Sequence, residues 1–148
     1  MKNAHSRSIR RVLAACATAT LLAPACESPF SPGAFDQLAF IAGFNVDDPH
    51  IDVPATVAAG SPFAVEVTTY GGGCVSEGYT QVSLTGRSAI VTPWDRNSGG
   101  EICTLELRSF RHSATLRFDE RGIATVTIRG MRVPGDEPVQ FDRHIVVE

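Results

Sequence analysis

The sequence predicts an all-β protein, a single antiparallel β-sandwich of about seven strands, with a small β-barrel as the alternative. Three observations lead to this prediction. From residue 50 onward apolar and polar residues alternate with a period of two, which is typical of half-buried strands in an antiparallel sheet. Turn-forming clusters of Gly, Pro, Ser and Asp separate the alternating runs. No window in this part shows the 3.6-residue period of an amphipathic helix.

The alternating runs follow one another along the chain and define the expected strands. Each run places its apolar residues on one face and Thr, Glu or Arg on the other. The expected inward positions are Phe63, Val65 and Val67; Val82 and Leu84; Ala89 and Val91; Cys103, Leu105 and Leu107; Ala114, Leu116 and Phe118; Ala124, Val126 and Ile128; and Ile145 and Val147. Turn signals such as Gly71-Gly72-Gly73 and Ser98-Gly99-Gly100 lie between them. The pattern predicts one domain over residues 47–148.

Residues 26–46 precede this domain and divide into two parts. Residues 27–33 are rich in Pro, Ser and Gly, which predicts an extended tether. Residues 35–46 are apolar and include Phe35, Phe40 and Phe44, which a disordered tether does not normally carry. This stretch predicts either an extra edge strand or a short helical turn against the domain.

Residues 1–25 have the composition of a bacterial export signal. They contain the basic residues Lys2, Arg7, Arg10 and Arg11 and no acidic residue, and residues 12–25 are uncharged. A basic start, a short apolar run and small residues at its end are the three parts of such a signal. The run is shorter than the roughly 20 apolar residues that a membrane-spanning helix needs. We expect residues 1–25 to be removed on export.

The segment Leu21-Leu22-Ala23-Pro24-Ala25-Cys26 resembles the lipobox of bacterial lipoproteins. That family prefers Leu three positions before the Cys, where this chain has Ala23. The resemblance implies that Cys26 becomes the new N-terminus, carries a lipid and anchors the protein to a membrane of the cell envelope. Ala23-Pro24-Ala25 also fits an ordinary signal peptidase site, which would cut the same bond and leave a periplasmic or secreted protein.

The cysteines favour the lipid-anchored interpretation. Of the four Cys in the chain, Cys16 is lost with the signal, and Cys26, Cys74 and Cys103 remain. An odd number of Cys in an oxidising compartment needs an explanation. Lipidation of Cys26 explains the odd number and leaves Cys74 and Cys103 to form a disulfide. A bridge across this separation stabilises a fold by about 3.5 kcal/mol in the chain-entropy model.

Removal of the signal also changes the charge of the protein. It takes away four of the 13 basic residues and none of the 16 acidic residues, so the formal net charge falls from -3 to -7. All basic residues that remain are Arg. An acidic, lysine-free chain is not attracted to nucleic acid or to anionic lipid headgroups. We therefore expect no nucleic-acid partner, and membrane contact through the lipid anchor alone.

The beginning of the domain resembles the first strands of bacterial immunoglobulin-like domains. The residues that carry the resemblance are Ile51-Asp52-Val53-Pro54 and Gly60-Ser61-Pro62-Phe63. The resemblance implies an immunoglobulin-like β-sandwich. The Cys-Trp-Cys arrangement of antibody domains is absent, because Trp94 lies only nine residues before Cys103.

A partial calcium-loop pattern begins at Asp95. Asp95, Asn97 and Glu106 stand at positions of the pattern that supply oxygen ligands, and Gly100 stands at its sharp turn. Position 5 is Gly99, which has no side-chain oxygen, and the flanking residues alternate as strands rather than helices. A glycine-rich hairpin turn is the favoured interpretation, and no metal is predicted. His112 lies in an alternating run and is expected to be a surface or hydrogen-bonded core histidine.

The sequence predicts no catalytic residue and no cofactor. A G-x-S-x-G nucleophile motif is absent, and the paired carboxylates lie in expected turns. The function that we expect is a non-catalytic binding or structural module of the cell envelope, with an envelope protein or a glycan as partner. The alternative is a carbohydrate- or peptide-binding accessory module whose binding face is formed by Tyr70, Tyr79 and Trp94.

Overall fold

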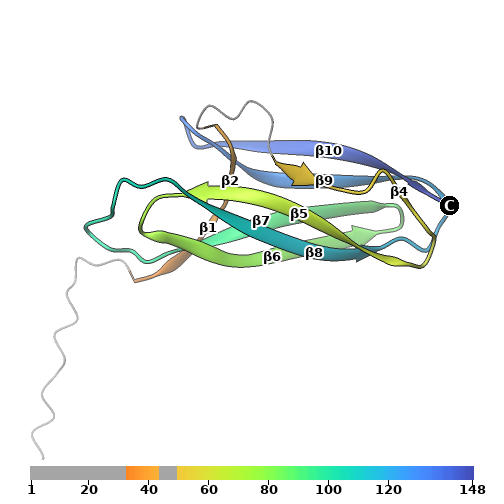
Figure 1. Ribbon diagram of the computed structural model, residues 1–148, viewed down its shortest axis with the longest axis horizontal. Helices are drawn as coiled ribbons and strands as arrows, with labels where there is room; N and C mark the ends of the chain where they lie inside the picture. The colour runs from red at the N-terminus through yellow and green to blue at the C-terminus, as the bar shows by residue number, and fades with distance from the viewer. Residues whose placement is uncertain (1–32, 44–49) are drawn as a thin grey trace, which may run out of the picture.

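The computed structural model describes residues 33–43 and 50–148, which form ten β-strands and no helix. The strands make one open, mixed sheet (Figure 1). The all-β prediction is confirmed; the barrel alternative is excluded, and the sheet is mixed rather than purely antiparallel. The predicted signal, Cys26 and most of the tether lie outside the described residues. The strands are β1 (Phe35–Leu38), β2 (Phe40–Ala42), β3 (Ile51–Asp52), β4 (Thr56–Val57), β5 (Pro62–Gly71), β6 (Val75–Thr85), β7 (Ser88–Asn97), β8 (Arg108–Arg117), β9 (Gly122–Arg132) and β10 (Glu137–Val147).

The hydrogen-bonded strands fall into two groups. One group has the order β6-β7-β9-β10-β4, and the other has the order β8-β5-β3. Strand β2 connects them, because it pairs with β5 and with β9. Strands β7 and β9 run parallel, since the chain between them crosses to the other group as β8 and then returns. Hairpins form the antiparallel pairs β6-β7 and β9-β10. The crossover connection between β7 and β9 forms a parallel pair, which makes the sheet mixed.

The apolar stretch before the domain is built into this sheet as β1 and β2. Strand β1 runs antiparallel to the second half of β7, whose first half pairs with β9. At Ala39 the chain turns back: the Ala39 N–H donates to the Pro93 carbonyl (3.1 Å), and the Ala39 carbonyl accepts from the Met131 N–H (2.9 Å). Strand β2 then follows β9 in parallel. The two short strands thus lie between β7 and β9 in the region where these strands no longer pair with each other. Strand β2 has a partner on each side, so it is an interior strand rather than an edge strand.

A single cluster of apolar side chains forms the core. The alternation predicted these positions correctly over β5, β7, β8, β9 and β10, because every second residue of these strands faces the same cluster. Both groups of strands contribute to it. Its fully or almost fully buried members are Ile41, Val65, Val67, Ala89, Val91, Ala114, Leu116, Phe118, Ala124, Val126, Ile128, Ile145 and Val147.

The predicted strand at Cys103, Leu105 and Leu107 is wrong. Residues 98–107 lie outside the strands, and β8 begins at Arg108. Cys103 is bonded to Cys74, and the Thr104 carbonyl accepts a hydrogen bond from the Gly73 N–H (3.1 Å). The segment is therefore tied to the β5-β6 turn and pairs with no strand among the described residues, and Leu105 and Leu107 are exposed.

Strand β6 is an exposed edge strand. It forms a hairpin with β7 through the two-residue turn Gly86-Arg87, in which Gly86 has the positive φ of 56° that such turns require. Val82 and Leu84 pair with buried Val91 and Ala89, so they point to the predicted inward side, yet both remain exposed. Their direction was predicted correctly and their burial was not.

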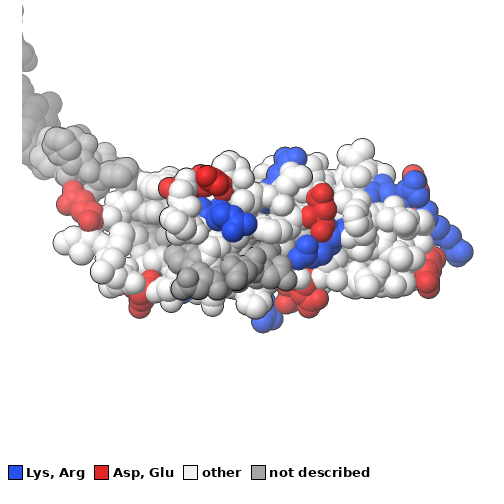
Figure 2. Space-filling view, turned by 90° about the horizontal axis from the view of Figure 1, so that it is seen from above, with Lys and Arg blue, Asp and Glu red and all other residues white. Residues whose placement is uncertain are grey.

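Several surface charges form pairs of opposite sign. Acidic and basic side chains are interspersed on the face that Figure 2 shows. Five Arg residues lie within 4.0 Å of a carboxylate, the shortest contact being Arg117 to Asp119 at 2.7 Å. Exposed pairs of this kind stabilise a fold by at most about 1 kcal/mol each. On the face shown in Figure 2, the two signs are mixed rather than gathered into a large field of one sign.

Candidate functional site

Tyr79 and Trp94 form a stacked aromatic pair on the outer face of the β6-β7 hairpin. They are register partners, so their side chains leave the sheet on the same side. The ring centroids are 6.1 Å apart and the planes differ by 13°. Tyr79 is 51% exposed, and Trp94 is half-buried. Trp94 lies between the buried residues Pro93 and Asp95, so the alternation of β7 turns it away from the core.

Polar groups surround this pair. The Trp94 indole N–H donates to Gln81 Oε1 at 3.3 Å, which fixes the ring from the β6 side. On the β1 side, Leu38 is the register partner of Trp94, and two pairs further along Arg96 Nη1 contacts Asp36 Oδ1 at 2.8 Å. We call Tyr79, Trp94, Gln81, Arg96 and Asp36 the aromatic platform: two stacked rings bordered by an amide and by a charged pair. This arrangement offers apolar ring surface and hydrogen-bonding groups side by side, as ligand sites commonly do.

Tyr70, the third aromatic residue of the predicted binding face, is not part of the platform. It is only 9% exposed, near the end of β5, where it pairs with Phe40 of β2. The structure therefore brings together two of the three aromatic residues, Tyr79 and Trp94. Phe40 was expected in an uncertain tether segment, so the strand that covers Tyr70 could not be recognised from the sequence.

The partial calcium-loop pattern does not assemble into a site. The Asp95 side chain is fully buried and accepts hydrogen bonds within the core. Asn97 bonds to the Gly99 N–H and to Gln37, and Glu106 lies on the exposed segment next to Arg108. The three candidate ligands thus face different directions, and among the described residues no three His, Cys, Asp or Glu side chains gather as metal ligands do.

Asp95 instead belongs to a buried polar cluster that the sequence analysis did not detect. His112 Nε2 lies 2.8 Å from Asp95 Oδ1, and the Thr69 hydroxyl donates to the same oxygen at 3.3 Å. On its other side, His112 Nδ1 lies 3.2 Å from the Thr80 hydroxyl. Asp95, His112 and Thr69 are each at most 1% exposed. The cluster connects β5, β6, β7 and β8, so it joins both groups of strands through one carboxylate.

The order hydroxyl, imidazole, carboxylate in this cluster also occurs in hydrolytic triads. In a triad the imidazole borders the cleft that receives the substrate. Here the imidazole and the carboxylate are enclosed by the core, and the hydroxyl belongs to a half-buried Thr80. The cluster is therefore a structural element. Asp95 Oδ2 is also buried and has no hydrogen-bond partner among the described residues, so the carboxylate depends on Oδ1 for its stabilisation.

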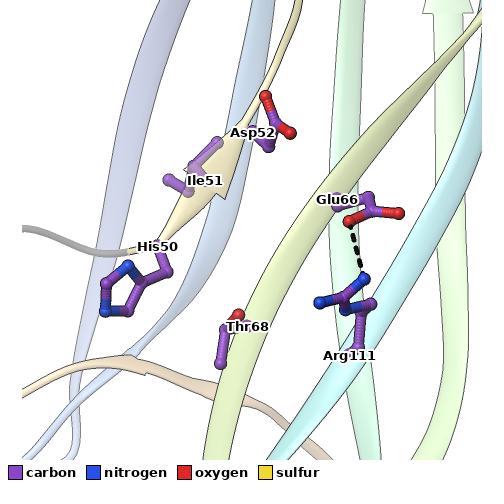
Figure 3. Close-up of a pocket in the computed structure, with 6 residues that line it drawn as sticks. All are labelled: His50, Ile51, Asp52, Glu66, Thr68 and Arg111. Carbon is purple, nitrogen blue, oxygen red and sulfur yellow. Dashed lines mark ion pairs between the residues drawn. The ribbon is translucent and has the colours of Figure 1, made fainter.

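A shallow groove of about 370 Å³ lies on the outer face of β3, β5 and β8 (Figure 3). It is lined by His50, Ile51, Asp52, Glu66, Thr68 and Arg111. Asp52 and Glu66 are register partners on one face, and Glu66 Oε2 lies 3.3 Å from Arg111 Nη1. Glycosidases place two carboxyl groups on opposite sides of the sugar. The carboxylates of this groove stand beside one another, so the groove does not provide that geometry.

Cys74 and Cys103 form the predicted disulfide, with their Cα atoms 5.1 Å apart. It links the turn after β5 to the segment between β7 and β8, at the same end of the sheet as the aromatic platform.

Comparisons with protein-family models, with curated proteins and with solved structures find no match to this chain. Residues 33–43 and 50–148 contain no helix that could span a membrane.

Proposed function

We propose that this chain is an exported, non-catalytic binding module that is anchored to a membrane of the cell envelope by a lipid on Cys26. Two observations support the anchor. The first is the segment that resembles a lipobox, directly before Cys26. The second is the disulfide between Cys74 and Cys103, which leaves Cys26 as the one cysteine of the processed chain without a cysteine partner.

We also propose that the strands form a β-sandwich of the immunoglobulin-like kind. The two hydrogen-bonded groups, β6-β7-β9-β10-β4 and β8-β5-β3, contribute side chains to the same core, as the two sheets of a sandwich do. The parallel pairing of β7 with β9 is a departure from an all-antiparallel sandwich. Such a fold would present β6 and β7 as an exposed outer face.

The aromatic platform is the observation that carries the binding function. Stacked rings present flat apolar surface, and a sugar ring covers such a surface with its C–H groups while its hydroxyls reach neighbouring polar side chains. Gln81 and the Arg96–Asp36 pair supply an amide, donors and acceptors beside the rings. Aromatic and Arg residues are also the types that contribute most energy to binding sites. A glycan is therefore the ligand class that we propose.

Replacement of the platform rings is expected to abolish glycan binding. In Trp94→Ala and in Tyr79→Ala, the affinity for soluble N-acetylglucosamine oligomers should fall about tenfold or more, because each ring supplies stacking area that alanine lacks. Titration calorimetry measures the affinity. Ile123→Ala is the control: it removes an exposed apolar side chain near the start of β9, outside the aromatic platform, and should leave binding unchanged.

Two results would contradict this function. The first is a wild-type protein that binds neither the N-acetylglucosamine oligomers nor oligomers derived from the cell wall. The second is a Trp94→Ala variant that keeps wild-type affinity while its free energy of unfolding is unchanged. If the wild-type protein bound an extended peptide and the Trp94→Ala variant lost that binding, the result would instead support the peptide-binding alternative.

The anchor is tested separately by the mass of the mature N-terminus. Protein purified from bacterial envelopes should begin at Cys26 and carry the added mass of acyl chains. Cys26→Ala should leave the envelope membranes and appear in the soluble fraction, because the single lipid is then absent. An unmodified Cys26 in the wild-type protein would disprove the anchor.

A further inference from the structure

Three aliphatic side chains project into solvent from residues 98–107, which we call the apolar loop. Ile102 is 94% exposed, Leu105 is fully exposed and Leu107 is 55% exposed. Single exposed apolar residues are common on soluble proteins. Three within six positions of one loop form a local group of the kind that marks a contact with another apolar phase.

The loop is held in its extended position. The disulfide fixes Cys103, which lies between Ile102 and Leu105, to Cys74 on the neighbouring turn. The backbone is also tied down by Gly73 N–H to the Thr104 carbonyl (3.1 Å) and Ser98 N–H to the Cys74 carbonyl (2.9 Å). A Cβ on Gly73 would overlap the Thr104 side chain, so the turn and the loop are in direct contact. These links restrain the loop in the position in which its aliphatic side chains are exposed.

The apolar loop lies at the end of the molecule where β1 begins (Figure 1). Phe35, the first residue of β1, is the register partner of Asn97, the last residue of β7 and the residue before the loop (Figure 1). Nine positions separate Cys26 from Phe35, and that length of chain spans at most about 30 Å. A lipid on Cys26 therefore holds this end of the molecule, and not the end with the C-terminus, close to the membrane surface.

We propose that the apolar loop inserts Ile102 and Leu105, with Leu107 at the water interface, into the membrane that holds the lipid on Cys26. The inference rests on the proposed lipid anchor for the orientation of the domain. It departs from the expectation that membrane contact is made by the lipid alone, which was based on the absence of electrostatic attraction. Aliphatic side chains enter the membrane interface without that attraction.

The charges beside the loop define the kind of lipid surface. Glu101 and Glu106 flank the aliphatic side chains, and Glu106 Oε1 lies 3.9 Å from the Arg108 guanidinium. Carboxylates disfavour anionic headgroups, so a zwitterionic surface is the better partner. The second contact would restrict how the domain tilts on its tether, because an anchor at one point leaves it free to rotate. The contact should also persist at high salt.

Tryptophan reporters on a tethered chain test the proposal. The chain from Cys26 onward contains every described strand, and its Cys26 thiol can be coupled to a maleimide lipid in phosphatidylcholine vesicles. In a Trp94→Phe background, Leu105→Trp or Ile102→Trp places one indole on the loop. Ile123→Trp places a matched indole at a 69% exposed position of β9, next to the C-terminal end of β10. Brominated acyl chains quench only an indole that enters the hydrocarbon region.

The expected result is at least a roughly twofold loss of fluorescence for both loop reporters, unchanged in 0.5 M salt, and no loss for the Ile123 reporter. Loop reporters that are quenched no more than the Ile123 reporter would overturn the proposal. Quenching of all three reporters alike would overturn it as well, because the contact would then be nonspecific. The maleimide lipid replaces the natural anchor, so this outcome is independent of whether Cys26 is lipidated in the cell. Cooperative unfolding of each variant, measured without vesicles, verifies that the chain is folded.

Discussion

His112→Leu is expected to lower the free energy of unfolding by about 3 to 5 kcal/mol. The Asp95 carboxylate is fully buried, and His112 Nε2 at 2.8 Å is its shortest hydrogen-bond contact. Without the imidazole, Asp95 keeps one hydrogen bond, from Thr69 at 3.3 Å, and its Oδ2 already has no partner among the described residues. A charge that is buried with so little compensation costs several kcal/mol. Urea unfolding followed by far-UV circular dichroism measures the loss.

A double-mutant cycle separates this effect from loss of packing. Asp95→Val/His112→Leu removes both partners and leaves apolar side chains in the core. The double variant should be more stable than His112→Leu alone, because no buried carboxylate remains. Asp142→Val is the surface control: it removes a 2.6 Å hydrogen bond with Thr127 at an exposed site and should cost at most about 1 kcal/mol. Additive losses in the cycle would show that the pair does not act as a unit.

Cys74→Ser/Cys103→Ser is expected to cost about 3.5 kcal/mol of unfolding free energy. The bridge closes a loop with a sequence separation of 29, and its removal returns that conformational freedom to the unfolded chain. The stability of a domain of this size is about 5 to 15 kcal/mol, so the loss is a large fraction of the total. Urea unfolding under oxidising conditions compares the variant with the wild-type protein.

Two comparisons check that the covalent link is responsible. Wild-type protein in a strong reductant should unfold with the free energy of the double-serine variant. Cys26→Ala, which removes the cysteine that is outside the bridge, should unfold like the oxidised wild-type protein. If the double-serine variant were within 1 kcal/mol of the oxidised wild-type protein, the disulfide would not be a main source of stability.

The alternation in the sequence identified the core positions of β5, β7, β8, β9 and β10. In β5, β8 and β9 the period of two selects Val65, Leu116 and Val126 as inward positions, and all three are buried. This works because a strand sends successive side chains to opposite faces wherever it lies in the sheet. The all-β class and the turn at Gly86 follow from equally local properties of the chain.

The same alternation failed for a segment that pairs with no strand in the part of the chain that the structure describes. Cys103, Leu105 and Leu107 have the pattern of a strand, yet they lie in the apolar loop because the disulfide ties this segment to a turn. A period of two describes what a strand would bury, and it contains no information on whether a neighbouring strand is there to cover it. For the same reason the exposure of Val82 and Leu84 on β6 could not be predicted.

The candidate sites depended even more on contacts between distant segments. Asp95 was considered as a calcium ligand because its sequence neighbours fit a pattern, but its bonded partner His112 comes from another strand across the core. Tyr79 and Trp94 meet through the register of a hairpin, whereas Tyr70 is covered by a strand that begins at Phe40. Such pairings are set by strand order, which the sequence pattern leaves open.

The sequence by itself determined the all-β class, the inward positions of the strands and the pairing of Cys74 with Cys103, because these depend on local periodicity and on a small number of cysteines. Only the tertiary structure decided the parallel pairing of β7 with β9, the buried cluster around Asp95, the aromatic platform and the exposed loop. The physical reason is that local pattern specifies which face of a segment is apolar. The identity of the surface that covers this face is specified by packing between segments far apart in the chain.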